Sequence, residues 1–160
     1  SKARIIEART DSQFEAARTL FKAYAAEIAV DLCFQNFANE LENIRGIYRP
    51  PRGCLLLAGR YRKIVGCVGI RPLAADVCEM KRLYVRPEAR GLNLGRELAH
   101  AAIGRARAAG YKRMFLDTLA SMHAALRLYR ALGFREVSPY YDNPLDGAVY
   151  LELPLNEGAE

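Results

Sequence analysis

The chain has 160 residues, of which 51% are hydrophobic and 26% charged, values typical of one folded soluble domain, and no apolar run approaches the roughly 18–20 residues of a membrane span. Its net charge of +6 suits either nucleic acid or a small polyanion, but the charges are scattered, without a basic run or interleaved aromatic residues, which argues against nucleic acid. The four cysteines, at 33, 54, 67 and 78, lack CxxC spacing, and the chain has only two histidines, so we expect reduced thiols and no metal centre. No secretory leader is recognisable, and we expect a cytoplasmic protein without a membrane partner. We expect residues 1–160 to form a single domain.

The first third of the chain predicts a strand followed by two helices. Residues 3–9 are typical of a short strand, and Thr10 or Asp11 is a suitable N-cap for the helix that follows. That helix has one apolar stripe, formed by Phe14, Ala17, Phe21, Tyr24 and Ile28. A second, weaker helix is expected over about 35–44, and the Pro-Pro-Arg-Gly segment 50–53 interrupts the pattern.

The middle of the chain predicts three strands, over residues 54–58, 64–70 and 77–85. The first is continuously apolar, which indicates burial on both faces of a sheet. The short connection at 61–63 makes the first two strands antiparallel neighbours.

The last part alternates helices and strands. We expect a helix from Leu94 to Gly110, a strand over 114–117, a helix over 122–132, and strands over 134–137 and 148–153. The whole order predicts an α+β fold, a mixed α/β sandwich, with a central, mostly antiparallel twisted sheet of six to seven strands and helices on both faces.

The turn that leads into the helix at Leu94 is the most informative segment. It reads Arg-Gly-Leu-Asn-Leu-Gly over residues 90–95, and such a turn offers free backbone N–H groups and the positive end of a helix dipole to a phosphate. A Walker A loop is excluded because Gly91 and Gly95 are too close and Arg96 follows them. A Rossmann loop is excluded because the spacing fails and the preceding strands are linked as hairpins.

The pattern Arg/Gln-x-x-Gly-x-Gly/Ala at a strand–helix junction is similar to the pyrophosphate loop of the GNAT superfamily of N-acetyltransferases. Arg90, Leu94 and Gly95 fit it, and Asn93, which tolerates a left-handed conformation, stands where the first glycine is usual. A second family signature is matched at Ala125, Leu128, Tyr129, Gly133 and Phe134, with Met122 in place of its asparagine. The chain is therefore identified as resembling this superfamily from its first strand to Leu155.

The resemblance implies that acetyl-CoA is the acyl donor and cosubstrate. It implies that the pyrophosphate is held by Arg90, Gly91, Leu92, Asn93, Leu94, Gly95 and Arg96. It also implies that the strand residues Leu83, Tyr84 and Val85 pair with the pantetheine arm, and that a bulge near Arg82 re-aims a backbone N–H toward the reacting carbonyl.

The resemblance implies direct attack of a primary amine on the thioester within a ternary complex, with Tyr129 as general acid and Glu79 as general base. A packing role for Tyr129, and an exposed cross-strand pair for Glu79, are the alternatives. A water chain, or Asp117 at the end of the next strand, could also serve as the base.

The acceptor is an unidentified small molecule or peptide. Tyr140, Tyr141 and Asp142 could hold an amine by cation–π and carboxylate contacts, or they could form an ordinary hairpin loop. The basic balance argues against a strongly cationic acceptor and is compatible with one that carries a carboxylate, such as an amino acid. A catalytically silent acyl-CoA sensor is the alternative function, and a homodimer is possible.

Overall fold

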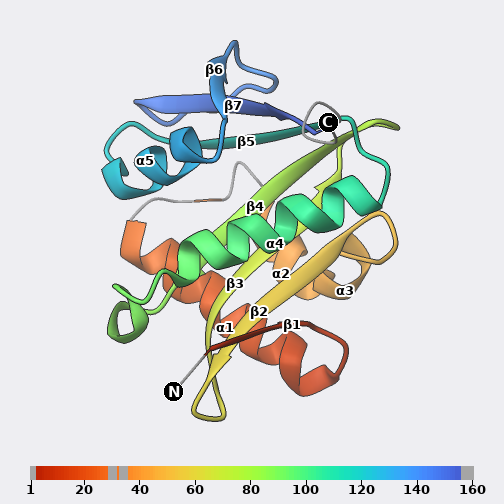
Figure 1. The fold of residues 1–160 in the computed structure, drawn as a ribbon, viewed down its shortest axis with the longest axis vertical. Helices are drawn as coiled ribbons and strands as arrows, with labels where there is room; N and C mark the ends of the chain where they lie inside the picture. The colour runs from red at the N-terminus through yellow and green to blue at the C-terminus, as the bar shows by residue number, and fades with distance from the viewer. Residues whose placement is uncertain (1–2, 29–31, 33–35, 156–160) are drawn as a thin grey trace.

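The computed structural model describes residues 3–28, 32 and 36–155, and its strands form one sheet of seven in the order β1-β2-β3-β4-β5-β7-β6 (Figure 1). The strands are β1 (Arg4–Glu7), β2 (Cys54–Arg60), β3 (Lys63–Pro72), β4 (Val77–Val85), β5 (Arg113–Leu119), β6 (Arg135–Val137) and β7 (Ala148–Pro154). Neighbouring strands are antiparallel, except that β4 and β5 are parallel. The predicted α+β fold and mostly antiparallel sheet are confirmed.

Helices cover both faces of the sheet, as expected. They are α1 (Asp11–Ile28), α2 (Phe37–Glu42), α3 (Ile44–Ile47), α4 (Leu94–Ala108) and α5 (His123–Ala131). The first three contribute to one hydrophobic cluster, and α4 and α5 contribute to the cluster on the opposite face (Figure 1). None of the described helices is both long and apolar enough to cross a bilayer.

The start of α1 is fixed by a reciprocal cap. Thr10 Oγ1 accepts a hydrogen bond from the Gln13 N–H at 3.2 Å, and Gln13 Oε1 accepts one from the Thr10 N–H at 3.0 Å. The predicted apolar stripe then buries Phe14, Ala17 and Phe21 against the sheet. The prediction of a helix that begins after Thr10 is therefore confirmed.

The single helix expected over 35–44 is replaced by two short helices, and Gln35 lies outside the described residues. The break falls at Asn43, whose side-chain amide donates to the backbone oxygen of Asn39 at 3.2 Å and to its side-chain oxygen at 2.7 Å. Asparagine side chains compete with the backbone in this way, which explains why the helix ends here.

Two local features shape β3 and the turn before it. Tyr61 and Arg62 both have positive φ, so the predicted tight connection between β2 and β3 is confirmed. On β3, a Cβ at Gly69 would lie 2.4 Å from a ring carbon of Tyr48, so only glycine lets this buried tyrosine lie flat against the strand. Tyr48 in turn positions α2, as described below.

The feature that shapes the site is an opening between β4 and β5. Their ladder holds only three residue pairs, from Val77 with Arg113 to Glu79 with Phe115. Both strands continue beyond it, β4 to Val85 and β5 to Leu119. On the side that faces β5, the backbone of residues 80–85 therefore lacks a strand partner, and the two strands diverge (Figure 1).

Candidate active site

The loop before α4 has the geometry of an anion cradle. Gly91 and Asn93 have φ of 85° and 65°, so asparagine does adopt the left-handed conformation expected where the family has glycine. Among the described residues, the loop and cap hydrogen bonds leave the N–H groups of residues 91–96 unused. These groups lie at the positive end of α4, and Arg96 adds an exposed cation in its first turn.

The side chain of Arg90 fastens this loop to the rest of the protein. Its Nε donates to the Val85 carbonyl at 2.9 Å, and its guanidinium pairs with Glu27 at 2.7 Å. Glu27 also accepts a hydrogen bond from the Tyr84 hydroxyl at 3.0 Å. Glu27 was missed by sequence reasoning because it lies on the polar side of α1, where nothing in the spacing marks it.

The expected bulge on β4 is confirmed. Cys67 pairs with Tyr84, but Gly69 pairs with Lys81, so β4 contains one residue more than β3 across this interval. Arg82 occupies the bulge with φ of 62°, an unusual conformation for a residue with a long side chain.

A buried ion pair holds this bulge. The Arg82 guanidinium donates from Nε and Nη2 to the two carboxylate oxygens of Glu40 on α2, at 3.1 and 2.7 Å, and the Tyr48 hydroxyl donates to the same carboxylate at 2.6 Å. Burial by itself raises the pKa of Glu40, but the hydrogen bonds and charge of Arg82 outweigh it and leave that pKa below its usual value. Sequence reasoning did not find this pair, because its partners are 42 positions apart.

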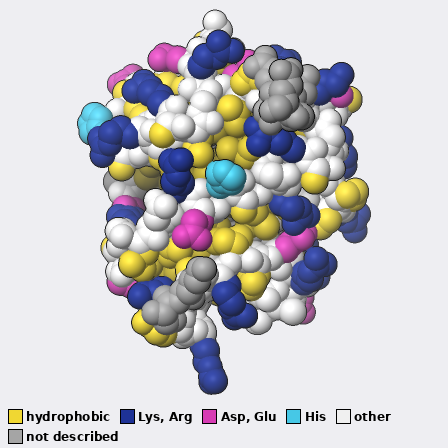
Figure 2. Space-filling model, in the orientation of Figure 1, with side chains coloured by type: hydrophobic (Ala, Val, Ile, Leu, Met, Phe, Trp, Pro, Cys, Tyr) yellow, Lys and Arg dark blue, Asp and Glu magenta, His cyan; other side chains and the backbone are white. Residues whose placement is uncertain are grey.

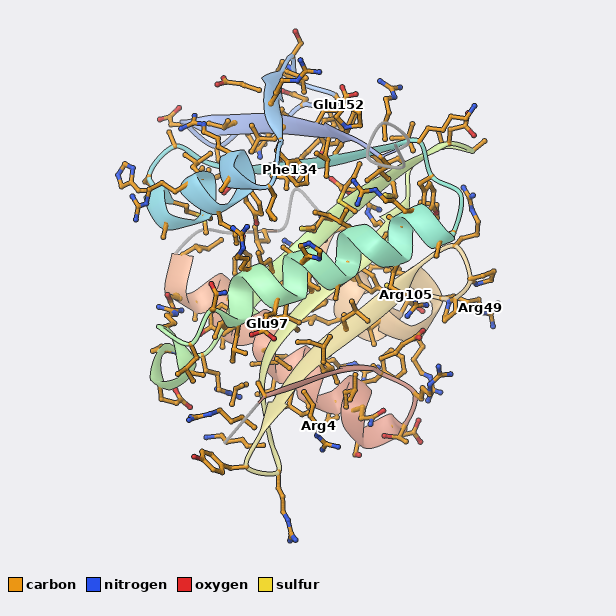
Figure 3. All side chains as sticks on the ribbon, in the orientation of Figure 1. Arg4, Arg49, Glu97, Arg105, Phe134 and Glu152 are labelled. Carbon is orange, nitrogen blue, oxygen red and sulfur yellow. The ribbon has the colours of Figure 1, made fainter. Side chains whose placement is uncertain are left out.

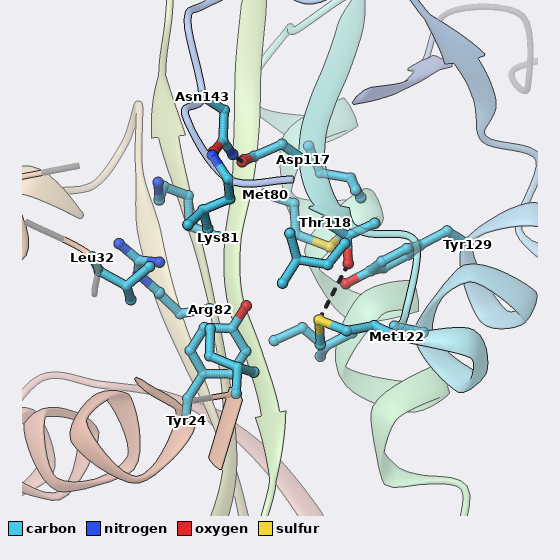
Figure 4. A pocket seen from close by; sticks show the side chains of 16 residues that line it. Tyr24, Leu32, Met80, Lys81, Arg82, Asp117, Thr118, Met122, Tyr129 and Asn143 are labelled. Carbon is cyan, nitrogen blue, oxygen red and sulfur yellow. Dashed lines mark hydrogen bonds between the residues drawn. The ribbon is translucent and has the colours of Figure 1, made fainter. Parts of the chain in front are cut away.

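The opening between β4 and β5 contains a cavity of about 80 Å³, shown in Figure 4. Met80 to Leu83 line one side of it and Leu116 to Leu119 the other, while Tyr24 and Tyr129 reach in from α1 and α5. Tyr129 is 7% exposed, and burial raises its pKa above the ordinary phenol value. Its hydroxyl makes no hydrogen bond to another described residue.

A second cavity, of about 460 Å³, adjoins the first, and Lys81 lines both. It is lined by Asn36, Asn39, Glu40, Ile47, Arg71, Leu73, Glu79, Lys81, Tyr140 and Tyr141. Acidic, basic, amide, phenol and apolar side chains thus meet in a space of the size that holds a small molecule.

Glu79 lies in the wall of the second cavity and is 1% exposed, so the exposed pair considered from sequence is not what forms. One oxygen accepts a hydrogen bond from Arg71 Nε at 2.8 Å, across the β3–β4 ladder, and the other accepts one from the Tyr140 hydroxyl at 2.6 Å. Both carboxylate oxygens are therefore engaged.

The loop before β7 docks on the ends of β4 and β5. Tyr140 bonds to Glu79, while the Tyr141 hydroxyl donates to Asp117 at 2.6 Å and Asn143 donates to the same carboxylate at 3.0 Å. The hydroxyls of both tyrosines thus bind carboxylates. Asp142 is exposed and lines a separate, open hollow formed by residues 139–148 and Tyr150, and it is not among the residues that line the second cavity with Tyr140 and Tyr141.

The sequence profile of the acetyltransferase (GNAT) family matches residues 14–134, which include the loop, the bulge and Tyr129. The chain belongs to this family. Over 142 residues it is 42% identical to an uncharacterized N-acetyltransferase of Schizosaccharomyces pombe, a match that covers 88% of this chain and 87% of that protein. A GNAT chain of this kind is an acyl-CoA-dependent N-acyltransferase.

Solved structures agree with the family assignment at the level of the fold. A GNAT acetyltransferase from Staphylococcus aureus matches with a TM-score of 0.80 and 24% identity, over 96% of this chain and 99% of that one. A putative acetyltransferase of Salmonella typhimurium, solved with its cofactor acetyl-CoA, matches with a TM-score of 0.74 and 20% identity, over 97% and 95% of the two chains.

Positive charge on this GNAT domain is spread rather than concentrated. Figure 2 shows lysine and arginine side chains distributed over the viewed face, interspersed with apolar and acidic ones. Of the four cysteines, Cys54, Cys67 and Cys78 are free and buried as expected, and Cys33 lies outside the described residues. No cluster of metal-binding side chains occurs among the residues that the structure describes.

Proposed function

We propose that the chain transfers the acetyl group of acetyl-CoA to a primary amine by direct attack in a ternary complex. The observation that supports this is the junction of two cavities at Lys81, one that contains the Tyr129 hydroxyl and one open to a small molecule. Donor and acceptor bound side by side need no covalent enzyme intermediate.

The chain offers a continuous binding path for the donor. The unused N–H groups of residues 91–96 and the α4 dipole suit its pyrophosphate. The backbone of residues 80–85, which lacks a strand partner on the side that faces β5, suits the amides of its pantetheine arm. Met122, in place of the usual asparagine, receives a hydrogen bond from Thr118 at 3.5 Å and adds an apolar wall to the first cavity, between β4 and β5. The donor supplies an activated thioester.

In the proposed reaction, the amine nitrogen bonds to the carbonyl carbon as the carbon–sulfur bond breaks. Tyr129 gives its hydroxyl proton to the departing thiolate, and its raised pKa keeps it protonated at neutral pH. The backbone N–H groups at the Arg82 bulge stabilise the negative charge that develops on the carbonyl oxygen.

The acceptor's proton must also leave. Because both oxygens of Glu79 are engaged, we assign proton removal to water in the second cavity and give Glu79 the role of positioning Arg71 and Tyr140. A direct base role for Glu79 remains the competing hypothesis, and the pH profile of a Glu79 variant separates the two.

A charge placed at the cradle tests the proposal. Calorimetric titration of Gly95→Asp with acetyl-CoA should show affinity lowered by at least about tenfold, because a carboxylate would face the pyrophosphate. Gly104→Asp is the matched control, since Gly104 lies on the same helix with open space around it, and its affinity should be unchanged.

Turnover is measured on the same samples as thiol release across classes of amine. Binding of acetyl-CoA with thiol release for one class of amine would support an active acetyltransferase. Binding without release for any class would favour the sensor instead. Equal affinity in the two aspartate variants would mean that the cradle is misplaced.

A further inference from the structure

We propose that the acceptor is an amine that also carries a carboxylate, an amino acid, and that the Arg71 guanidinium binds that carboxylate in the second cavity. This inference rests on the proposed acetyl transfer and specifies its acceptor. It depends on hydrogen bonding in the cavity: both carboxylates there already accept hydrogen bonds, whereas the two terminal nitrogens of Arg71 have no acceptor among the described residues.

The two acidic side chains of the cavity are engaged. Glu40 accepts hydrogen bonds from Arg82 and Tyr48, and Glu79 accepts them from Arg71 and Tyr140, so every carboxylate oxygen has a partner within 3.1 Å. Among the described lining residues, no carboxylate is left to receive a second cationic group. An acceptor with several positive charges, such as a polyamine, would therefore meet no counter-charge here.

Arg71 is in the opposite situation. Only its Nε is engaged, by Glu79, while its two terminal nitrogens contact no hydrogen-bond acceptor among the described residues and its side chain is 39% exposed. A guanidinium held at Nε keeps its outer N–H groups in a fixed fork, which matches the two oxygens of a carboxylate. Tyr140 holds Glu79 in turn, so the orientation of Arg71 is set by two further residues.

The two ion pairs at the cavity differ in what they leave for a ligand. The side chains of Arg82 and Glu40 are 4% and 7% exposed, so that pair is closed to solvent, whereas the Arg71 side chain that pairs with Glu79 is 39% exposed and lines the cavity. An anion can therefore reach Arg71 but not Arg82. Arg71 lines only the second cavity and Lys81 lines both, so a carboxylate bound to Arg71 would lie on the acceptor side of the junction.

The size and the remaining walls fit an amino acid. A volume of about 460 Å³ is that of a small-molecule site. Ile47 and Leu73 offer apolar surface to a side chain, and Asn39 offers an amide whose N–H groups have no partner among the described residues.

The first test needs no variant. Thiol release is measured with the unmodified chain, acetyl-CoA and matched acceptors that share a side chain, namely each α-amino acid, its carboxamide and the amine without the carboxylate. We expect kcat/KM for the best amino acid to exceed that of its carboxamide by at least about tenfold. The carboxamide has the more acidic ammonium group, so amine basicity alone would favour the opposite order.

The second test is Arg71→Gln, with Arg71→Lys to keep the charge without the fork. Both should raise KM for the amino acid by at least about tenfold, leave KM for acetyl-CoA unchanged, and reduce the difference between acid and carboxamide. Arg4→Gln is the control, because Arg4 is an exposed cation on the edge strand β1, two strands away from the strand β3 that carries Arg71 (Figure 3). It should change neither KM.

The outcomes separate this inference from the proposed function. Thiol release that is equal for acids and carboxamides, or greater for carboxamides or for multiply charged amines, would overturn the carboxylate site and leave the acetyltransferase in place. A preference for acids that Arg71→Lys and Arg71→Gln leave intact would overturn the role of Arg71. Lack of acetyl-CoA binding would instead remove the proposed function.

Discussion

Replacing Glu40 by glutamine should destabilise the fold and disturb the bulge on β4. The substitution keeps the shape of the side chain and removes its charge, which leaves the Arg82 guanidinium buried, with its side chain 4% exposed, and without a counter-ion. A glutamine oxygen in the place of Oε2 can still accept two of the three hydrogen bonds, from Tyr48 and from Arg82 Nε, while the bond from Arg82 Nη2 to Oε1 is lost.

The expected magnitude follows from that geometry. Breaking a buried ion pair by removing one partner costs about 3–5 kcal/mol. Because two hydrogen bonds can survive, we expect a value at the lower end of this range: the free energy of unfolding should fall by about 3 kcal/mol, which lowers Tm by about 6–12 °C in a chain of this size.

Urea denaturation followed by far-UV circular dichroism measures this change. Glu15→Gln is the matched control, since Glu15 pairs with Arg18 at 3.1 Å on the surface of α1 and is 67% exposed. It should cost only about 0.2–0.5 kcal/mol. A loss below about 1 kcal/mol for Glu40→Gln would refute the reasoning that this pair anchors α2 to the bulge.

The pH dependence provides an independent check. The folded protein holds the pKa of Glu40 below the usual 4.5, so the carboxylate stabilises the fold above that value, and this contribution is lost as pH falls through the lower folded pKa. The difference in unfolding free energy between the unmodified chain and Glu40→Gln should therefore be full at neutral pH and shrink below about pH 4.5. A difference that is constant down to pH 3 would contradict an ionic origin.

Three further results are expected. Tyr129→Phe should lower kcat by at least about tenfold without changing acetyl-CoA affinity. Tyr24→Phe, in the same cavity, is the control and should keep most of the original kcat. Equal losses of kcat in the two variants would remove Tyr129 from the acid role. Glu79→Gln should raise the acceptor KM and leave the pH profile of kcat/KM unchanged, and a displaced profile would make Glu79 the base. Burial raises the thiol pKa of Cys54 to about 11 and of Cys78 to about 12, so mass mapping at pH 8 should find both unreacted with a thiol reagent until the chain unfolds.

Much of the fold was readable from local signals. The helix that begins at Leu94, the turn at 61–63 and the strand over 77–85 depend on dihedral preferences and apolar periodicity, which act over a few residues. The helix expected over 35–44 failed for an equally local reason, the side chain of Asn43, which periodicity alone does not weigh.

The candidate site divides in the same way. The sequence by itself determined the family, the left-handed Asn93 in the loop before α4, and the position of Tyr129 on α5, because each is encoded by contiguous residues whose spacing has a direct conformational meaning. The tertiary structure alone decided what lines the second cavity: the Glu40–Arg82 pair joins residues 42 positions apart, and the Tyr140–Glu79 contact joins residues 61 apart. No local pattern specifies such contacts, because they arise only when the diverging strands, α2 and the loop before β7 are brought together by the burial of a common core.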